Sequence, residues 1–170
     1  DKIKTKTYYT LKGKTILNKY PELKDCTNFN SFDENKSEIV VAVSLTRRIT
    51  DSQLNQFIDR ANVMKIEVDN PNDNIIKYKQ QLDDYVNFIM DKFEQLTRDY
   101  PNTIKIHFVY FGQSCLAFEI GKRCVDSTRI PQIISYQFEN QNQIKYPWGM
   151  VINGSHKGDL VRSEVAANNV

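Results

Sequence analysis

The sequence has few of the residues that form disulfide frameworks, metal sites and nucleophilic catalytic centres. It contains only two histidines and three cysteines, and no two cysteines form a CxxC pair. An odd number of cysteines without paired spacing is typical of a reduced, cytoplasmic protein. No cluster of cysteine, histidine and carboxylate residues has the spacing of a metal site. We therefore expect no metal and no cofactor.

Long apolar runs and a strong excess of one charge are also missing. No stretch approaches the roughly 20 apolar residues that span a bilayer, and the first residues do not resemble a signal peptide. The net charge is only +2, which argues against a protein that coats long nucleic acid but is compatible with a local pocket for one small anion. A length of 170 residues suits one domain with a substantial core.

The sequence does contain an alternation of buried-strand and amphipathic-helix patterns. Runs of β-branched and aromatic residues predict strands at 39–45, 104–111, 132–138 and 144–152, and a short one at 64–68. Apolar residues three and four apart predict helices from Thr50 or Asp51 to Ala61, along 75–100 up to Pro101, and along 114–125. The alternation predicts an α/β fold, a small Rossmann-like domain with a mostly parallel central sheet flanked by helices.

The chain divides into three parts by composition. Residues 1–38 are polar and predict an N-terminal extension or linker, 39–152 hold the predicted domain, and 153–170 predict a loosely held C-terminal tail. Because the chain begins with Asp1 rather than methionine, we expect an excised or processed piece, with any fused partner outside it.

Two polar segments follow predicted strands. Gly112-Gln113-Ser114 joins the strand 104–111 to the next helix, and Thr46-Arg47-Arg48 follows the strand 39–45. If these strands are parallel, both segments lie at one edge of the sheet, where helix amino ends and guanidinium groups bind anions. The alternatives are that Ser114 only caps its helix and that the arginines lie on a solvated loop.

Three aromatic residues are candidates for stacking on an unpaired base. Tyr146 and Trp148 flank Pro147 in a segment that begins with Lys145, and Tyr136 lies at the end of the strand 132–138. Aromatic planes beside a basic residue are used to stack bases and neutralise phosphates. The alternative is that these rings fill the core.

Nucleophilic catalysis is disfavoured. Gly112-Gln113-Ser114-Cys115-Leu116 is similar to a nucleophile elbow, but bulky Leu116 stands where the elbow needs a second small residue. His107 lies inside a predicted strand and His156 in the predicted tail, so neither Ser114 nor Cys115 has a well-placed base. We expect no catalytic residue in this chain.

A resemblance to the SAVED domain is carried by the segments IVVAVSLT (39–46), IKIHFVYFGQSCLAFEIGKR (104–123), PQIISYQF (131–138) and KYPW (145–148). SAVED domains are the sensors of bacterial CBASS antiphage effectors and are related to the CARF sensors of CRISPR systems. The resemblance implies that the chain binds a cyclic di- or trinucleotide. Binding would then drive self-association and activate a fused effector domain.

The resemblance also implies where the ligand binds. The loops at the carboxyl ends of the strands supply the contacts in the family. The matching residues here are Thr46, Arg47, Arg48, Gln113 and Ser114, with Tyr136, Tyr146 and Trp148 added as stacking groups.

The chain departs from the family in two ways. Many members have a proline in the corner loop where this chain has Gly112 and Gln113, and many have two CARF-like halves where this chain has one. The single half is similar to the shorter form fused to HNH nucleases, and we expect a second protomer to complete its site. Two alternatives remain open, a ring nuclease-type enzyme that cleaves the bound nucleotide and a module that only oligomerises.

Overall fold

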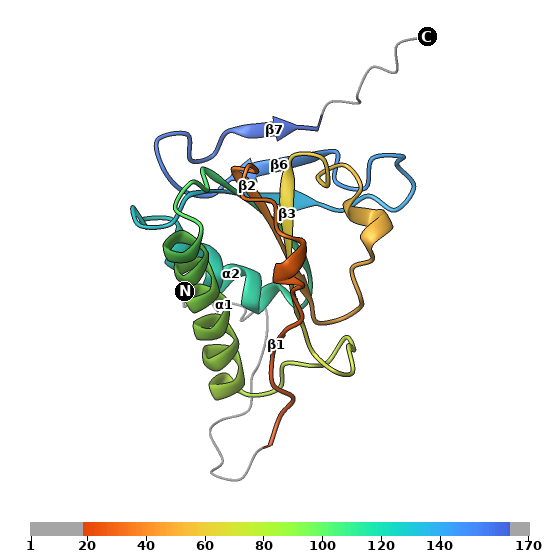
Figure 1. The fold of residues 1–170 in the computed structure, drawn as a ribbon. Coiled ribbons are helices and arrows are strands. Elements are labelled where there is room, and N and C mark those ends of the chain that lie inside the picture. The colour runs from red at the N-terminus through yellow and green to blue at the C-terminus, as the bar shows by residue number, and fades with distance from the viewer. Residues whose placement is uncertain (1–18, 164–170) are drawn as a thin grey trace, which may run out of the picture.

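The centre of the protein is a seven-stranded sheet with the strand order β1-β3-β2-β4-β5-β6-β7 (Figure 1). The structure is a computed structural model and describes residues 19–163. The strands are β1 (Lys24–Asp25), β2 (Glu38–Ser44), β3 (Ala61–Glu67), β4 (Lys105–Phe111), β5 (Gln132–Gln137), β6 (Trp148–Val151) and β7 (Leu160–Arg162). The helices are α1 (Lys79–Asp99) and α2 (Ser114–Cys124), and two short 3₁₀ helices cover Phe29–Ser31 and Asp51–Leu54.

The four inner strands are parallel, and the outer ones are antiparallel. β2 pairs in parallel with both β3 and β4, and β4 pairs in parallel with β5. β1, β6 and β7 join the edges in antiparallel pairings. The expected α/β fold is therefore present, but the sheet is mixed, with three parallel and three antiparallel pairings rather than mostly parallel ones.

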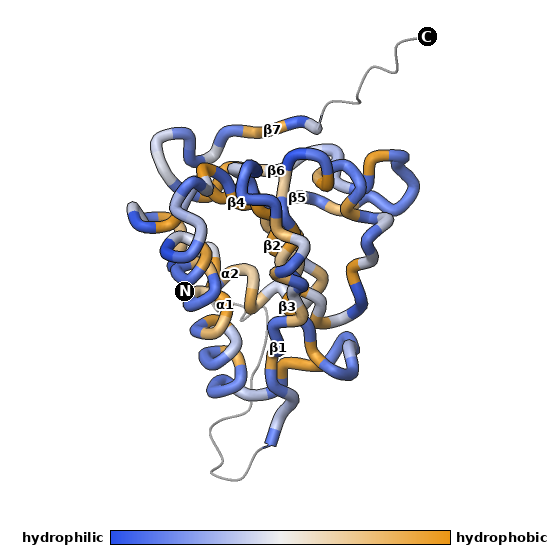
Figure 2. The backbone as a smooth tube through the Cα atoms, in the orientation of Figure 1, coloured by the Kyte–Doolittle hydropathy of each residue, from blue (hydrophilic) through white to orange (hydrophobic). Residues whose placement is uncertain are grey.

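The sheet is covered on both faces, which explains the unbroken apolar run of β2. Side chains alternate along a strand, so Ile39, Val41 and Val43 join the core under α1 and α2, while Val40 and Ala42 join a second core on the other face. The segment 46–60 covers this second face, opposite the two helices (Figure 1). The hydropathy colouring shows the apolar residues concentrated in the strands between these layers (Figure 2).

The helix predicted after Thr50 is wrong. A capping box between Thr50 and Gln53 starts only a 3₁₀ helix, Ile58 is exposed, and Ala61 already begins β3. Leu54 and Phe57, three residues apart, both pack in the second core. Side chains three apart lie on one side of a 3₁₀ helix, so 3₁₀-type turns bring both of them to the sheet.

Other element boundaries also differ from the predictions. α1 begins at Lys79, and Ile75 and Ile76 lie in the preceding loop although both are buried. Ala117, which the helical spacing of apolar residues predicts on the inner face of the helix 114–125, is exposed, and Cys115 is buried under α2 instead. The strand at 64–68 is longer than expected and begins at Ala61, whereas the strand at 144–152 begins only at Trp148, after Pro147.

The sheet extends beyond residues 39–152 at both ends. β1 lies within the predicted extension, and β7 lies within the segment expected to be a loose tail, where it pairs with β6. The segment 153–163 is therefore part of the sheet region. The stretch TYYTL (7–11), whose composition predicts a short edge strand, lies outside the described residues. No helix in the described part of the chain is long and apolar enough to cross a membrane.

A buried polar network joins β2, β4 and β5 on the second face. His107 is 1% exposed, its Nε2 lies 2.7 Å from the Glu38 carboxylate, and its Nδ1 lies 2.9 Å from the Tyr136 hydroxyl. A neutral imidazole that donates from Nε2 and accepts at Nδ1 satisfies both partners. Lys105 and Arg60 also contact Glu38. The network replaces apolar packing at this position of the core.

The network predicts that the protein loses stability in acid. A hydrogen bond from His107, with help from Lys105, lowers the pKa of Glu38 from 4.5 to about 2, and burial lowers the pKa of His107 from 6.5. Between the folded and unfolded pKa values the unfolded chain binds more protons, so lowering the pH favours unfolding. The free energy of unfolding, measured by urea titration, should fall below pH 6.5 and more steeply below pH 4.5.

The two histidines provide a matched comparison for this prediction. His107→Gln should flatten the pH dependence of the free energy of unfolding above pH 4.5. His156→Gln changes an exposed residue and should keep the wild-type pH dependence. Parallel profiles for wild type and His107→Gln would show that the network does not set the pH dependence.

Candidate ligand-binding edge of the sheet

The loops after β2 and β4 meet at one edge of the sheet, which we call the carboxyl edge. The parallel register places Ser44 beside Phe111. The backbone N–H groups of Leu45 and Thr46 both donate to the Phe111 carbonyl oxygen, at 2.8 and 2.9 Å. The prediction that these two bends lie together is confirmed.

The loop after β3 joins the same edge, which the sequence patterns did not indicate. Asn72 donates its backbone N–H to the Leu45 carbonyl at 3.1 Å. The Gln113 side chain binds the backbone of Ile76 on both sides, accepting from its N–H at 2.6 Å and donating to its carbonyl at 3.1 Å. Gln113 therefore holds two loops together. The run of turn-forming residues after β3 was a signal for a loop there, but only the parallel pairing of β3 with β2 brings that loop to the carboxyl edge.

Tyr110 explains why the strand-to-helix corner is tight. Its hydroxyl donates to the Gln113 carbonyl at 2.7 Å, so the ring folds over Gly112. A Cβ atom at Gly112 would lie 2.1 Å from the Tyr110 oxygen, far inside contact distance. Ser114 is the first residue of α2 and is exposed. Its hydroxyl has no hydrogen-bond partner among residues 19–163, so the alternative that it caps α2 is not observed.

The two arginines after β2 have different partners. Arg48 forms an ion pair with Glu67 and donates to the carbonyl of Asp69 at 3.0 Å, which ties it to the end of β3. Arg47 has no carboxylate partner in the described part of the chain. Its guanidinium carbon lies 4.3 Å from the centre of the Phe111 ring and 5.4 Å from that of Phe138. Arg47 is therefore an exposed cation held at the carboxyl edge by aromatic rings.

The three predicted stacking aromatics lie in different environments. Tyr146 is 1% exposed and packs against Phe57 and Phe138 in the second core. Tyr136 is directed toward His107, with which it shares a hydrogen bond. Only Trp148 is exposed, at 38%, and its indole N–H donates to Glu139. As they stand, Tyr136 and Tyr146 do not present an open face for stacking.

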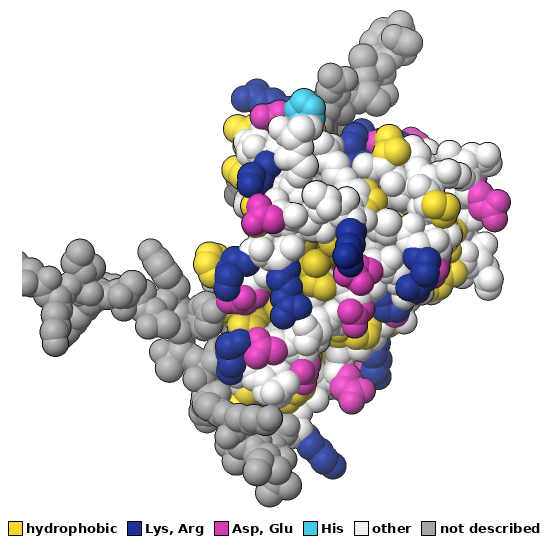
Figure 3. Space-filling model, turned by 90° about the vertical axis from the view of Figure 1, so that its left-hand side faces the viewer, with side chains coloured by type: hydrophobic (Ala, Val, Ile, Leu, Met, Phe, Trp, Pro, Cys, Tyr) yellow, Lys and Arg dark blue, Asp and Glu magenta, His cyan; other side chains and the backbone are white. Residues whose placement is uncertain are grey.

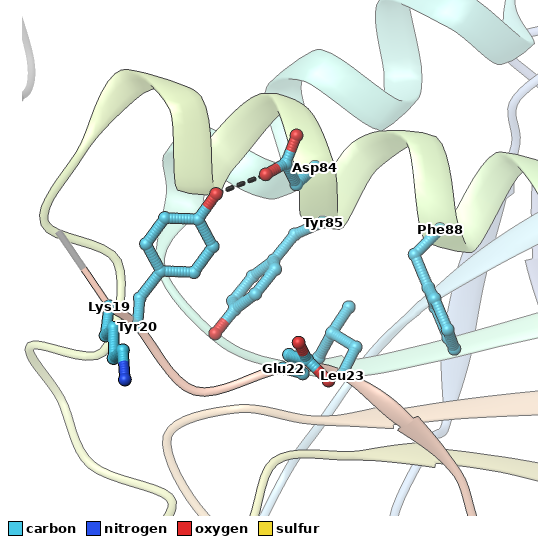
Figure 4. A pocket seen from close by; sticks show the side chains of 7 residues that line it. All are labelled: Lys19, Tyr20, Glu22, Leu23, Asp84, Tyr85 and Phe88. Carbon is cyan, nitrogen blue, oxygen red and sulfur yellow. Dashed lines mark hydrogen bonds between the residues drawn. The ribbon is translucent and has the colours of Figure 1, made fainter. Parts of the chain in front are cut away.

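A groove beside the carboxyl edge has a different character. It has a volume of about 630 Å³ and lies between residues 19–23 and the first turns of α1. Its lining includes the carboxylates of Glu22 and Asp84, and the Tyr20 hydroxyl donates to Asp84 (Figure 4). This hydrogen bond, with burial, raises the pKa of Tyr20 to about 12. Two carboxylates against the single amine of Lys19 make this groove a poor site for an anion.

Surface charge elsewhere does not suggest a nucleic-acid platform. On the face shown in Figure 3, basic and acidic side chains alternate without a large area of one sign. No group of three or more histidine, cysteine, aspartate or glutamate residues within 19–163 could hold a metal ion. The local feature that fits an anion is the carboxyl edge, which carries the exposed Arg47 cation on the loop after β2 and the Ser114 hydroxyl at the amino end of α2 after β4.

Comparisons with known proteins identify relatives of this fold. The family model of the SMODS-associated and fused to various effectors sensor domain, SAVED, matches residues 5–152. Solved structures with a similar fold include the Cap4 SAVED/CARF-domain receptor of Acinetobacter baumannii with the cyclic trinucleotide 2'3'3'-cAAA, at a TM-score of 0.53 and 14% identity over 80% of this chain and 27% of that chain. Its structure with 3'3'3'-cAAA gives the same values.

A further structure of that receptor gives a TM-score of 0.51 at 13% identity, over 79% of this chain and 25% of that chain. The chain thus spans about a quarter of the receptor's length, and at this identity the likeness shows the fold alone. A search of curated proteins found no match.

The corner geometry predicts opposite effects of alanine at two glycines. Gly112→Ala should lower the free energy of unfolding by about 1–3 kcal/mol because the new methyl group collides with the Tyr110 ring. Gly121→Ala is the control, since a Cβ atom at this position of α2 would meet no other atom within 4 Å; it should stabilise by about 0.5–1 kcal/mol through helix propensity. Urea denaturation measures both, and an unchanged stability of the Gly112→Ala protein would contradict the close approach of Tyr110 to Gly112.

Proposed function

Because the chain belongs to the SAVED family of sensor domains, we propose that it binds a cyclic oligonucleotide, a cyclic di- or trinucleotide, at the carboxyl edge. The Cap4 receptors with a similar fold have been solved with cyclic trinucleotides. In open α/β sheets, ligands bind at the carboxyl ends of parallel strands. The proposal combines the family, the fold and the position of the edge.

The observation that carries the proposal is the exposed guanidinium of Arg47, which lies where two loops meet. A guanidinium that has no carboxylate partner among residues 19–163 can bind a phosphate by paired hydrogen bonds without first breaking an ion pair. Ser114 offers a free hydroxyl and the amino end of α2 on the adjacent loop. Together they provide a cation, a hydroxyl and backbone N–H groups for a phosphodiester.

The other predicted contact residues act indirectly in this proposal. Arg48 and Gln113 fix the loops through Glu67 and Ile76. Thr46 belongs to the loop after β2 and is fixed by its backbone bond to Phe111. Tyr136 supports the core, and Trp148 lies on β6, two strands away from β4.

We further propose that the chain acts as a sensor without cleaving its ligand. Neither histidine lies at the carboxyl edge: His107 is inside the sheet, and His156 follows β6 in the turn before β7. A ring nuclease needs a general base within hydrogen-bond reach of the reacting group. The effector domain that such a sensor controls would be supplied by sequence fused to it.

We also propose that ligand binding promotes self-association. β7 is an edge strand, and the exposed side chains of Trp148, Met150 and Leu160 lie on β6 and β7. An edge strand with exposed apolar residues can pair with another strand, and Arg162 is the one charged residue of β7. A second protomer at this edge would extend the sheet.

Binding should depend on Arg47 and much less on Arg48. In calorimetric titrations with a panel of cyclic di- and trinucleotides, at least one ligand should bind tightly, and Arg47→Ala should weaken it by about 10–100-fold, the range for a charge-assisted hydrogen bond. Arg48→Ala is the matched control because Arg48 is already paired with Glu67. The absence of binding across the panel would contradict the proposed function.

Self-association should depend on β7. Light scattering should show a mass increase on addition of the ligand, and Leu160→Lys should reduce it because a lysine on an edge strand opposes pairing. Ile104→Lys is the control, since Ile104 is 63% exposed and Leu160 67%, but Ile104 precedes β4 and is not on an edge strand. Association that ignores every nucleotide would instead support a module that only oligomerises.

A further inference from the structure

Tyr146 has an unusual buried hydroxyl. Its oxygen is the one buried side-chain polar atom within residues 19–163 that lacks a hydrogen-bond partner. The backbone of Tyr146 is fully engaged, because Gln56 binds both its N–H and its carbonyl, and Ser163 donates to the same carbonyl. Buried polar groups without partners are costly. A hydroxyl kept in such a place requires an explanation other than packing, since phenylalanine would fill the same space.

A series of contacting aromatic rings connects Tyr146 with the carboxyl edge. Tyr146 packs against Phe138 at a ring-centre distance of 5.6 Å, and Phe138 packs edge-on against Phe111 at 4.8 Å. Phe111 is the last residue of β4, at the corner that leads to Ser114. We call Phe111, Phe138 and Tyr146 the aromatic box.

Arg47 lies over this box. Its guanidinium carbon is 4.3 Å from the Phe111 ring centre and 5.4 Å from that of Phe138. Burial raises the pKa of Tyr146 to about 12, and the positive charge of Arg47 opposes this rise by favouring the ionised hydroxyl. A planar guanidinium stacks on aromatic rings in the same way as a nucleobase.

We propose that the aromatic box is a base-binding subsite, and that a base of the ligand displaces the Arg47 guanidinium from it. The base stacks on Phe111 with Phe138 at its edge, because the two rings are nearly perpendicular, and the Tyr146 hydroxyl donates to an acceptor on the base. The released guanidinium turns to the ligand's phosphate. This inference rests on the proposed function and names the part of the ligand that the edge recognises.

The exchange is physically reasonable on both sides. Stacking of a base on an aromatic ring is stronger than an exposed cation–π contact, so the box gains by the replacement. Arg47 gains a charged partner in place of a neutral ring. The same residue therefore covers the box before binding and neutralises phosphate afterwards, which couples recognition of the base to recognition of the phosphate.

The coupling predicts that Arg47→Ala has opposite effects on two kinds of ligand. For adenosine and guanosine, which carry no phosphate, the variant should bind about two- to fivefold more tightly than wild type, the factor for removal of a competing exposed cation–π contact. Shifts of the aromatic ring resonances in NMR titrations measure this. Arg98→Ala is the control, since Arg98 is exposed in the last turn of α1, and it should bind these nucleosides like wild type. For the cyclic oligonucleotide, Arg47→Ala should bind more weakly.

Tyr146→Phe tests the hydroxyl. It should weaken the binding of purine nucleosides to the Arg47→Ala protein by about two- to tenfold, the range for one hydrogen bond. Its melting temperature should stay the same or rise, because the change removes an unpartnered polar group. A loss of stability without loss of nucleoside binding would show that the hydroxyl has only a structural role.

The outcomes separate this inference from the proposed function. If wild type binds a cyclic oligonucleotide but Arg47→Ala binds nucleosides no better than wild type, the base-binding box is refuted and the proposed function stands. If no cyclic oligonucleotide binds but Arg47→Ala gains nucleoside binding, the box stands and the proposed function falls.

Discussion

The parallel pairing of β2 with β4 is the constraint on which the rest of the structure depends. Their register ends both strands at the same level, with Ser44 beside Phe111. The Phe111 carbonyl then accepts from Leu45 and Thr46, so the chain leaves β2 directly across the end of β4. Arg47, the next residue along the chain, is thereby placed over the Phe111 ring. The candidate site is a consequence of this one pairing.

Two glutamine side chains play the same part on the two faces of the sheet. The Gln113 amide binds the backbone of Ile76 on the side of the helices, and the Gln56 amide binds the backbone of Tyr146 on the other side. Each amide both donates to and accepts from the backbone of one residue, as a strand neighbour would. They fix loops that the sheet itself does not reach. Arg47, by contrast, has no ion-pair partner in the described region.

The fold was largely predictable because its signals are local. The β-branched run of β2 and the apolar periodicity of α1 identify a strand and a helix without reference to other segments. The helix after Thr50 failed for a reason that is not local, since Leu54 and Phe57 pack against the sheet in the second core through 3₁₀-type turns. β7 was missed because three residues are too few to show a pattern, and their pairing with β6 defines them.

The sequence by itself determined most of the helices and strands. It also determined that polar segments follow two apolar strands. Those properties depend on residue type and spacing along a few turns or a single strand. Only the tertiary structure decided which side chains at the edge are free. Gln113 finds its partner 37 residues away, Arg48 finds Glu67 19 residues away, and Gln56 reaches Tyr146 across 90. Hydrogen bonds over such separations arise from the packing of the whole chain, so residue type alone cannot show that Arg48 is paired and Arg47 is not.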